Sequence, residues 1–238
     1  LPLATGPRSD ARSVFLADGR ALTVGGQGAA PLASADLFDP DQQSLRPTAG
    51  LAQGRYGHTL TRLRDGRVLV VGGVGAAGSL ASAEVFDPAR ERWLPAGDLS
   101  ATRVFGEAFT LPSGRVVVLG GFDSFGHGAL QPRVTAEVFD PRANSWSELP
   151  NLRFSPGDWA QLADGRLLHL GAPVAIYDFD AQPPAMTPLP QASFTSRSFT
   201  ARTLLATGEL LIAGGASGFG GPTQSVHAEV DLFDPATN

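Results

Sequence analysis

The sequence contains no cysteine and no lysine, and only one methionine and two tyrosines occur among its 238 residues. Without cysteine there is no disulfide, no thiolate metal site and no cysteine nucleophile. No apolar run approaches the roughly 18 residues of a membrane-spanning helix. The four histidines, at positions 58, 127, 169 and 227, show no metal-like spacing, so we expect no metal and no cofactor.

The net charge is −5, and all 18 basic residues are arginines. An acidic chain is poorly suited to bind nucleic acid or an anionic membrane surface, so neither is expected as a partner. Guanidinium groups are planar and match the geometry of carboxylates and phosphates. The cations of this chain are therefore suited to binding small anionic groups.

What the sequence has in abundance is a repeat of short β-rich runs separated by turn residues. LTRLRDGRVLVVGG at 60–73 is followed by a loop of small residues and then by AEVFDP at 83–88. The same order occurs five times, with turn glycines at Gly19, Gly66, Gly114, Gly165 and Gly208, separated by 47, 48, 51 and 43 residues. A period near fifty residues made of strands is typical of a propeller blade.

Each repeat predicts four strands, which we name A to D in chain order. Strands A and B form a hairpin across a turn such as Asp18-Gly19, for which we expect the two-residue primed type with a positive φ at both residues. Strand B ends in paired glycines, strand C ends in aromatic-Asp-Pro, and strand D holds Trp93 or Trp146, which we expect to pack between sheets. The fourth repeat is degenerate at Gly171-Ala172, and the fifth stops before its outer strand.

These features resemble kelch repeats. The resemblance is carried by the aromatic-Asp-Pro of strand C, by the two tryptophans and by the paired glycines at 25–26, 72–73, 120–121 and 214–215. It implies an all-β fold, a β-propeller of four-stranded antiparallel blades similar to the bacterial kelch and galactose oxidase central-domain superfamily. Kelch propellers usually have six or seven blades, so we expect the five repeats to form an arc of a larger ring. A complete five-bladed ring is the alternative.

We assign residues 1–238 to a single propeller domain. The repeats lie near 8–54, 55–102, 103–152, 153–196 and 197–238. The chain does not begin with methionine and shows no signal peptide, so we expect it to be a segment of a longer chain that supplies further blades or domains. The resemblance to secreted bacterial kelch proteins implies an extracellular or periplasmic location.

The loops of such blades fall on two faces. The A–B and C–D turns share one face and are short and stereotyped, which indicates a structural role. The B–C loops and D–A crossovers share the other face, and two B–C loops are long, at 122–133 and 216–227. Binding residues concentrate on variable loops of a rigid scaffold, so we expect ligand contacts on this second face. The candidates on its long loops are Asp123, Phe125, His127, Phe219 and His227. The alternative for the phenylalanines is that they fold back onto the blades.

The D–A crossovers carry an arginine eleven residues before the turn glycine in four of the five repeats. These candidate ligand-binding residues are Arg8, Arg55, Arg103 and Arg197, and the fourth repeat has Phe154 at the same position. Several guanidinium groups near the mouth of the central channel would suit a carboxylate, sulfate or phosphate. The alternative is that each arginine braces its own blade against the next by bonding backbone carbonyls or a neighbouring acid.

No catalytic constellation is present, and we name no catalytic residue. We predict a non-catalytic binding module that recognises a glycan or a protein segment through the B–C/D–A face. The alternatives are a carbohydrate-active enzyme, similar to sialic-acid mutarotase or related to the oxidases, and a structural scaffold or spacer. Enzymes resembling galactose oxidase use copper with a Tyr cross-linked to Cys and further His and Tyr ligands. This segment has no Cys and only Tyr56 and Tyr177, so it cannot house that chemistry.

Overall fold

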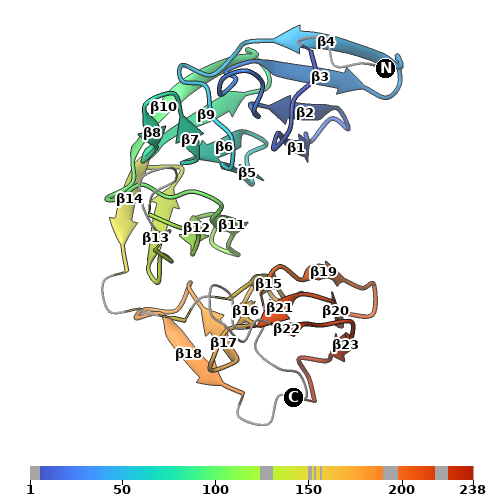
Figure 1. The fold of residues 1–238 in the computed structure, drawn as a ribbon, viewed down its shortest axis with the longest axis vertical. Coiled ribbons are helices and arrows are strands. Elements are labelled where there is room, and N and C mark those ends of the chain that lie inside the picture. The colour runs from blue at the N-terminus through green and yellow to red at the C-terminus, as the bar shows by residue number, and fades with distance from the viewer. Residues whose placement is uncertain are drawn as a thin grey trace. The chain divides into compact units, whose positions relative to one another are not determined.

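The computed structural model describes residues 6–123, 131–149, 152, 154–155, 157–189, 198–217 and 225–237 (Figure 1). These residues form β-strands joined by turns and loops, and none of them lies in a helix. The described part of the chain therefore contains no helix long and apolar enough to cross a membrane. The all-β fold predicted from the sequence is confirmed.

The strands form five antiparallel blades, one for each repeat. In every blade A pairs with B and B with C, and in blades 1 to 4 C also pairs with D. Blade 1 consists of β1 (Arg12–Phe15), β2 (Ala21–Val24), β3 (Ala35–Asp39) and β4 (Ser44–Thr48). Blade 2 consists of β5 (Thr59–Arg62), β6 (Val68–Val71), β9 (Ser82–Asp87) and β10 (Arg92–Asp98), with the small hairpin β7 (Val74–Gly75) and β8 (Gly78–Ser79) in its B–C loop. Blade 3 consists of β11 (Glu107–Thr110), β12 (Val116–Leu119), β13 (Ala136–Asp140) and β14 (Ser145–Glu148).

The last two repeats depart from this pattern in their details. Blade 4 consists of β15 (Trp159–Gln161), β16 (Leu167–His169), β17 (Ala175–Asp178) and β18 (Ala185–Pro188). Blade 5 consists of β19 (Ala201–Leu204), β20 (Leu210–Ala213) and β23 (Val230–Phe233), with the hairpin β21 (Ala216–Ser217) and β22 (Ser225–Val226) in its B–C loop. The described sheet of blade 5 thus has three strands, as the sequence predicts.

The chain divides into two compact units. Unit 1 comprises Leu1–Thr110 and Gly114–Pro150 and holds blades 1 to 3, whereas unit 2 comprises Leu111–Ser113 and Asn151–Asn238 and holds blades 4 and 5. The assignment of residues 1–238 to one domain and the size of the complete ring stay predictions.

The core lies between neighbouring blades of the same unit. In blades 2 and 3 strand B is apolar on both faces, and all four residues of β6 and of β12 are buried. One cluster joins Leu22 and Leu37 of blade 1 to Val68 and Phe86 of blade 2, and a similar cluster joins blades 4 and 5. Because a single sheet cannot bury both of its faces, each blade depends on its neighbours for stability.

The A–B hairpins are present, but their turns differ from the predicted two-residue type. The Leu16 N–H donates to the Arg20 carbonyl at 2.8 Å, so the loop has three residues, Ala17, Asp18 and Gly19. Only Gly19 has a positive φ, of 87°. The turn is therefore a three-residue loop closed by a left-handed glycine. The Asp18 carboxylate accepts from the Arg20 backbone N–H at 3.1 Å, which explains the aspartate in this turn.

The strand D tryptophans link successive blades in unit 1. The Trp93 indole N–H donates to the carbonyl of Ala49 in blade 1 at 2.9 Å, and its ring centroid lies 5.1 Å from that of Phe86. Trp146 donates in the same way to Ala96 in blade 2 at 2.8 Å. Both indoles are half-buried and pack between blades.

Candidate functional site

On the face predicted to bind a ligand, one backbone bridge recurs from blade to blade. In four blades the residue after the crossover arginine forms an isolated bridge with the residue after the paired glycines. These pairs are Ser9 with Gln27, Tyr56 with Val74, Val104 with Phe122 and Ser198 with Ala216. Each of these D–A crossovers is therefore tied to the B–C loop of its own blade, and the two loop types share one surface.

Arg55, the residue before the bridge of blade 2, is buried. Its Nη1 donates to the carbonyls of Gly72 and Ser82 at 2.9 Å each, and its Nη2 forms an ion pair with Glu84 at 3.1 Å. Its own carbonyl accepts from the N–H of Gly26 in blade 1 at 2.9 Å. Arg55 thus holds the preceding blade through its backbone and its own blade through its side chain.

Arg8 and Arg103 make the same contacts in blades 1 and 3. Arg8 pairs with Asp36 at 3.0 Å and Arg103 pairs with Glu137 at 3.5 Å, and each Nη1 donates to two backbone carbonyls of its own blade. Both arginine side chains are 1% exposed. These contacts match the alternative stated above, in which each arginine braces its blade by bonding backbone carbonyls or a neighbouring acid. Arg197 lies outside the described residues, and a ligand-binding role for the crossover arginines stays a prediction.

Burial shifts the pKa of two of these arginines. It lowers the pKa of Arg55 and of Arg103, and the neighbouring carboxylates of Glu84 and Glu137 act in the opposite direction. A guanidinium group keeps its proton even so, because its ordinary pKa is far above neutral. Each pair is therefore a buried pair of opposite charges.

Blade 4 lacks both members of the pair. Phe154 occupies the position of the arginine, and the strand register places Ala175 at the position of the acid. His169 lies beside them, with its Nε2 3.0 Å from the Ser155 carbonyl and its ring stacked on Trp159 at 4.3 Å. The arginine and the acid are present together in blades 1 to 3 and absent together in blade 4. This is expected of two groups that are costly to bury singly.

Two histidines are buried within the blades. Burial lowers the pKa of His58 to about 3 and that of His169 to about 4. Both imidazoles are therefore neutral at pH 7.

Two of the five candidates on the long loops lie in the described part of the chain. The Asp123 carboxylate accepts from the Gln131 N–H at 3.2 Å and so closes the base of the blade 3 loop. The His227 N–H donates to the Gly215 carbonyl at 2.9 Å, and its Nδ1 lies 3.3 Å from the Glu229 carboxylate. Their ligand contacts stay predictions. The other candidates, Phe125, His127 and Phe219, lie outside the described residues.

Sequence reasoning did not single out two apolar side chains on this face. Phe199 is 61% exposed and Val226 is 84% exposed. Val226 pairs with Ala216, which in turn bridges Ser198, the residue before Phe199. Phe199 has a φ of 61°, a conformation that costs a non-glycine residue about 1–3 kcal/mol. The equivalent positions in blades 1 to 3 hold Asp10, Gly57 and Phe105, which all have a positive φ, so no signal in the sequence set Phe199 apart.

The comparisons with known proteins agree with the fold. The Kelch motif matches residues 56–100 and 111–153, which fall in blades 2 and 3. A fungal alcohol oxidase of the AA5 family, solved in complex with copper, has a TM-score of 0.69 and 18% identity, and the match covers 98% of this chain and 53% of that chain. The structure of YjhT has a TM-score of 0.64 and 15% identity, with 97% of this chain and 85% of that chain covered. No curated protein matches the chain.

The two similar structures bear on the fold alone. The chain spans about half the length of the oxidase. No group of three His, Cys, Asp or Glu side chains able to hold a metal ion occurs among the described residues. Tyr177 is buried beside Trp159, and Tyr56 lies in the bridge with Val74. The described donors do not fit a copper centre like that implied by the oxidase.

Proposed function

We propose that this chain, which is built of kelch-repeat β-propeller blades, is a non-catalytic binding module for a protein segment, acting through the B–C/D–A face. The observation that carries the proposal is the exposure of Phe199 and Val226 on that face, at 61% and 84%. Exposed apolar groups mark interaction sites when they gather, and aromatic residues are enriched at protein interfaces.

The contacts that hold the crossovers in place support the same function. Buried arginine–acid pairs hold the crossovers of blades 1 to 3, and the Ser198–Ala216 bridge holds the crossover of blade 5. A surface that is already ordered loses little conformational entropy when a partner binds. The strained φ of Phe199 is maintained in this way before any partner arrives.

The test is a selection of random peptides from a display library on the intact protein, beside an array of neutral and acidic glycans. We expect the selected peptides to bind the Phe199→Ser, Val226→Ser double variant about tenfold or more weakly, because the loss of both apolar contacts together should exceed ~1.4 kcal/mol. The matched control is Leu204→Ser. Leu204 is 42% exposed in the same unit but lies at the A–B turn end of β19, so its replacement should leave affinity unchanged.

Three outcomes would contradict the proposal. They are binding of glycans alone, equal peptide binding by the parent and the double variant, and no binding in either assay. The last outcome would favour the scaffold alternative. An extracellular or periplasmic location stays part of the proposal, and fractionation of the source cells tests it.

A further inference from the structure

Blades 1 and 2 meet at a joint that contains a buried histidine. The Gly26 N–H of blade 1 donates to the Arg55 carbonyl of blade 2 at 2.9 Å. A Cβ added to Gly25 would lie 2.9 Å from the Cε1 of His58, so the imidazole packs directly against the backbone of blade 1. His58 itself is 1% exposed. We call Gly25, Gly26, Arg55 and His58 the blade 1–2 joint.

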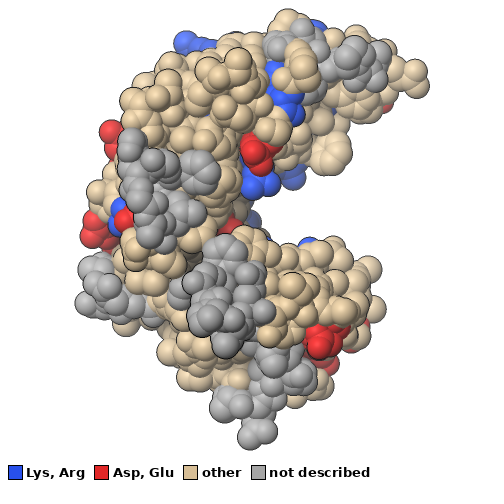
Figure 2. All heavy atoms as spheres, in the orientation of Figure 1, with Lys and Arg blue, Asp and Glu red and all other residues tan. Residues whose placement is uncertain are grey.

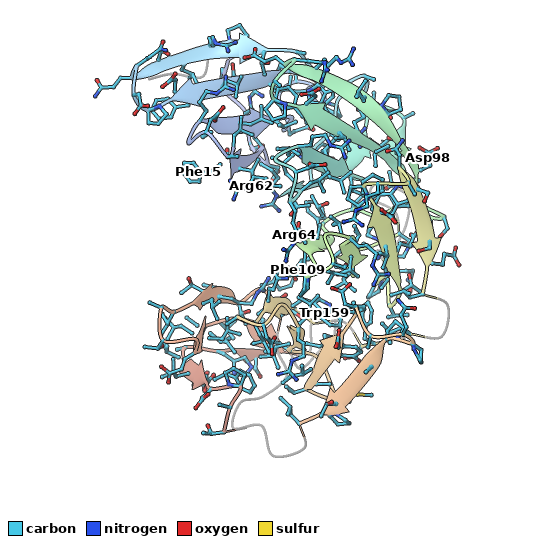
Figure 3. All side chains as sticks on the ribbon, turned by 180° about the vertical axis from the view of Figure 1, so that it is seen from behind. Phe15, Arg62, Arg64, Asp98, Phe109 and Trp159 are labelled. Atoms are coloured by element: carbon cyan, nitrogen blue, oxygen red, sulfur yellow. The ribbon has the colours of Figure 1, made fainter. Side chains whose placement is uncertain are left out.

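A separate contact holds the other end of the two inner strands. β1 and β5 contact each other, and Figure 3 shows Phe15 of β1 and Arg62 of β5 close together. Here an Arg62 N–H donates to the Phe15 carbonyl at 3.2 Å, at the A–B turn end of both strands. The blade 1–2 joint lies at the opposite end, where strand B of blade 1 runs into its B–C loop. A change confined to the joint would therefore leave this second contact in place.

The imidazole of His58 is poorly provided with hydrogen bonds. Neither of its ring nitrogens has a hydrogen-bond partner among the described residues. The Arg55 carbonyl beside the ring favours the charged form, but this carbonyl already accepts from the Gly26 N–H. Burial of a neutral polar group without a partner is costly, and burial of a charged one is far more costly. The closed joint therefore favours the neutral imidazole.

The charges near His58 act in the same direction as burial. Burial, together with the positive charges of Arg55 and of Arg12 on β1, lowers the pKa of His58 to about 3. The acid of this region, Glu84, pairs with Arg55 at 3.1 Å and accepts from the Ala52 N–H at 2.9 Å, so both of its oxygens are engaged. Figure 2 shows basic side chains gathered on the edge of unit 1 where Figure 1 draws β1 and β5. A proton on His58 would thus add a further positive charge to a region whose acid is already paired.

The repeats show that a blade does not require a histidine at this position. The residues immediately before strand A in the other blades are Ala11, Gly106, Asp158 and Thr200. Blades 2 and 3 meet through the same backbone bond, from the Gly73 N–H to the Arg103 carbonyl at 2.9 Å, with Gly106 in place of His58. This second joint is an internal control that lacks the titratable ring.

We propose that the blade 1–2 joint is an acid-sensitive switch, which opens when His58 takes up a proton. Opening gives the ring access to water and releases Gly26, where the B–C loop of blade 1 begins. The open joint binds a proton at the ordinary histidine pKa of about 6.5, whereas the closed joint binds it only near pH 3. The closed joint is therefore fully favoured above pH 6.5 and loses stability as the pH falls from there toward 3. The switch does not depend on the function proposed for the B–C/D–A face.

Amide hydrogen exchange of the intact chain, followed by NMR at pH 7.5 and at pH 5.5, tests the switch. The protection factor compares each amide with an unstructured amide at the same pH. We expect the protection factor of the Gly26 N–H to fall about tenfold at the lower pH, because protonation of an open joint with an ordinary histidine pKa favours opening by that factor. The Gly73 N–H lies in the joint without a histidine and should keep its protection.

Two variants locate the effect. His58→Leu cannot take up a proton, so Gly26 should be equally protected at both pH values. His169→Leu removes the buried histidine of unit 2 and should leave the fall at Gly26 unchanged. The proposal is overturned if Gly26 keeps its protection in the parent at pH 5.5, if Gly26 and Gly73 lose it equally, or if the fall persists in His58→Leu. If His58→Leu does not fold, the comparison of Gly26 with Gly73 in the parent decides.

Discussion

Replacing Arg55 with methionine is expected to lower the free energy of unfolding by about 3–5 kcal/mol, the usual cost of removing one partner of a buried ion pair. The substitution leaves the buried Glu84 carboxylate without its cation, and it removes the donor to the carbonyls of Gly72 and Ser82. Urea denaturation followed by tryptophan fluorescence measures the loss.

The double variant Arg55→Met, Glu84→Leu is the matched control for this prediction. It removes both charges, and blade 4 already combines the apolar residues Phe154 and Ala175 at these positions. Apolar replacement of a whole buried pair is often nearly neutral. We therefore expect the double variant to recover the part of the stability that the unpaired Glu84 charge costs, while the Gly72 and Ser82 carbonyls stay without their donor. A double variant that loses the sum of the two single losses would show that the charges are not coupled.

Replacing Gly72 with valine is expected to cost about 2–5 kcal/mol, from left-handed backbone strain and overpacking together. Gly72 has a φ of +64°, and a Cβ there would lie 2.2 Å from the Arg103 carbonyl oxygen. That oxygen also accepts from the Gly73 N–H at 2.9 Å, so moving it away would break a hydrogen bond. The urea midpoint of the variant gives the cost.

Gly120 is the matched control for Gly72. It occupies the same position in blade 3 with a φ of +59°, but within unit 1 a Cβ there would meet none of the described atoms within 4 Å. Gly120→Val should therefore show the backbone strain alone, about 1–3 kcal/mol. Equal losses at the two glycines would mean that the close approach of Arg103 contributes nothing.

Local signals explain why the blades could be predicted from the sequence. Asp-Gly, Gly-Gly and aromatic-Asp-Pro each fix a turn or a strand end, and their recurrence gives the number of strands. The A–B turn type could not be predicted in the same way. Asp18-Gly19 fits more than one hairpin, and the pairing of Leu16 with Arg20 decides the loop length.

The candidate site was harder to predict from the sequence than the blades. Recurrence identified Arg8, Arg55 and Arg103 but could not tell whether they face a ligand or the blade. Their acids lie 28, 29 and 34 residues further along the chain, on strand C, and only the folded register brings each pair together. Arg64 differs from the residues at its equivalent positions, which are Ala17, Pro112, Ala163 and Ala206, whereas Phe199 recurs as Phe105 in blade 3. A residue that differs from its equivalents in the other repeats, and whose side chain is also exposed, is thus a candidate for a role other than building the blade.

One pair of variants tests most directly whether the recurring arginines hold the blades together while a non-recurring arginine is not required for stability. Arg103→Gln and Arg64→Gln make the same substitution in unit 1, and their free energies of unfolding are compared in urea. We predict a loss of about 2–4 kcal/mol for Arg103→Gln, which breaks a buried pair, and a change below ~0.5 kcal/mol for the exposed Arg64. An Arg103→Gln variant as stable as the parent, or an Arg64→Gln variant that loses as much, would contradict this division.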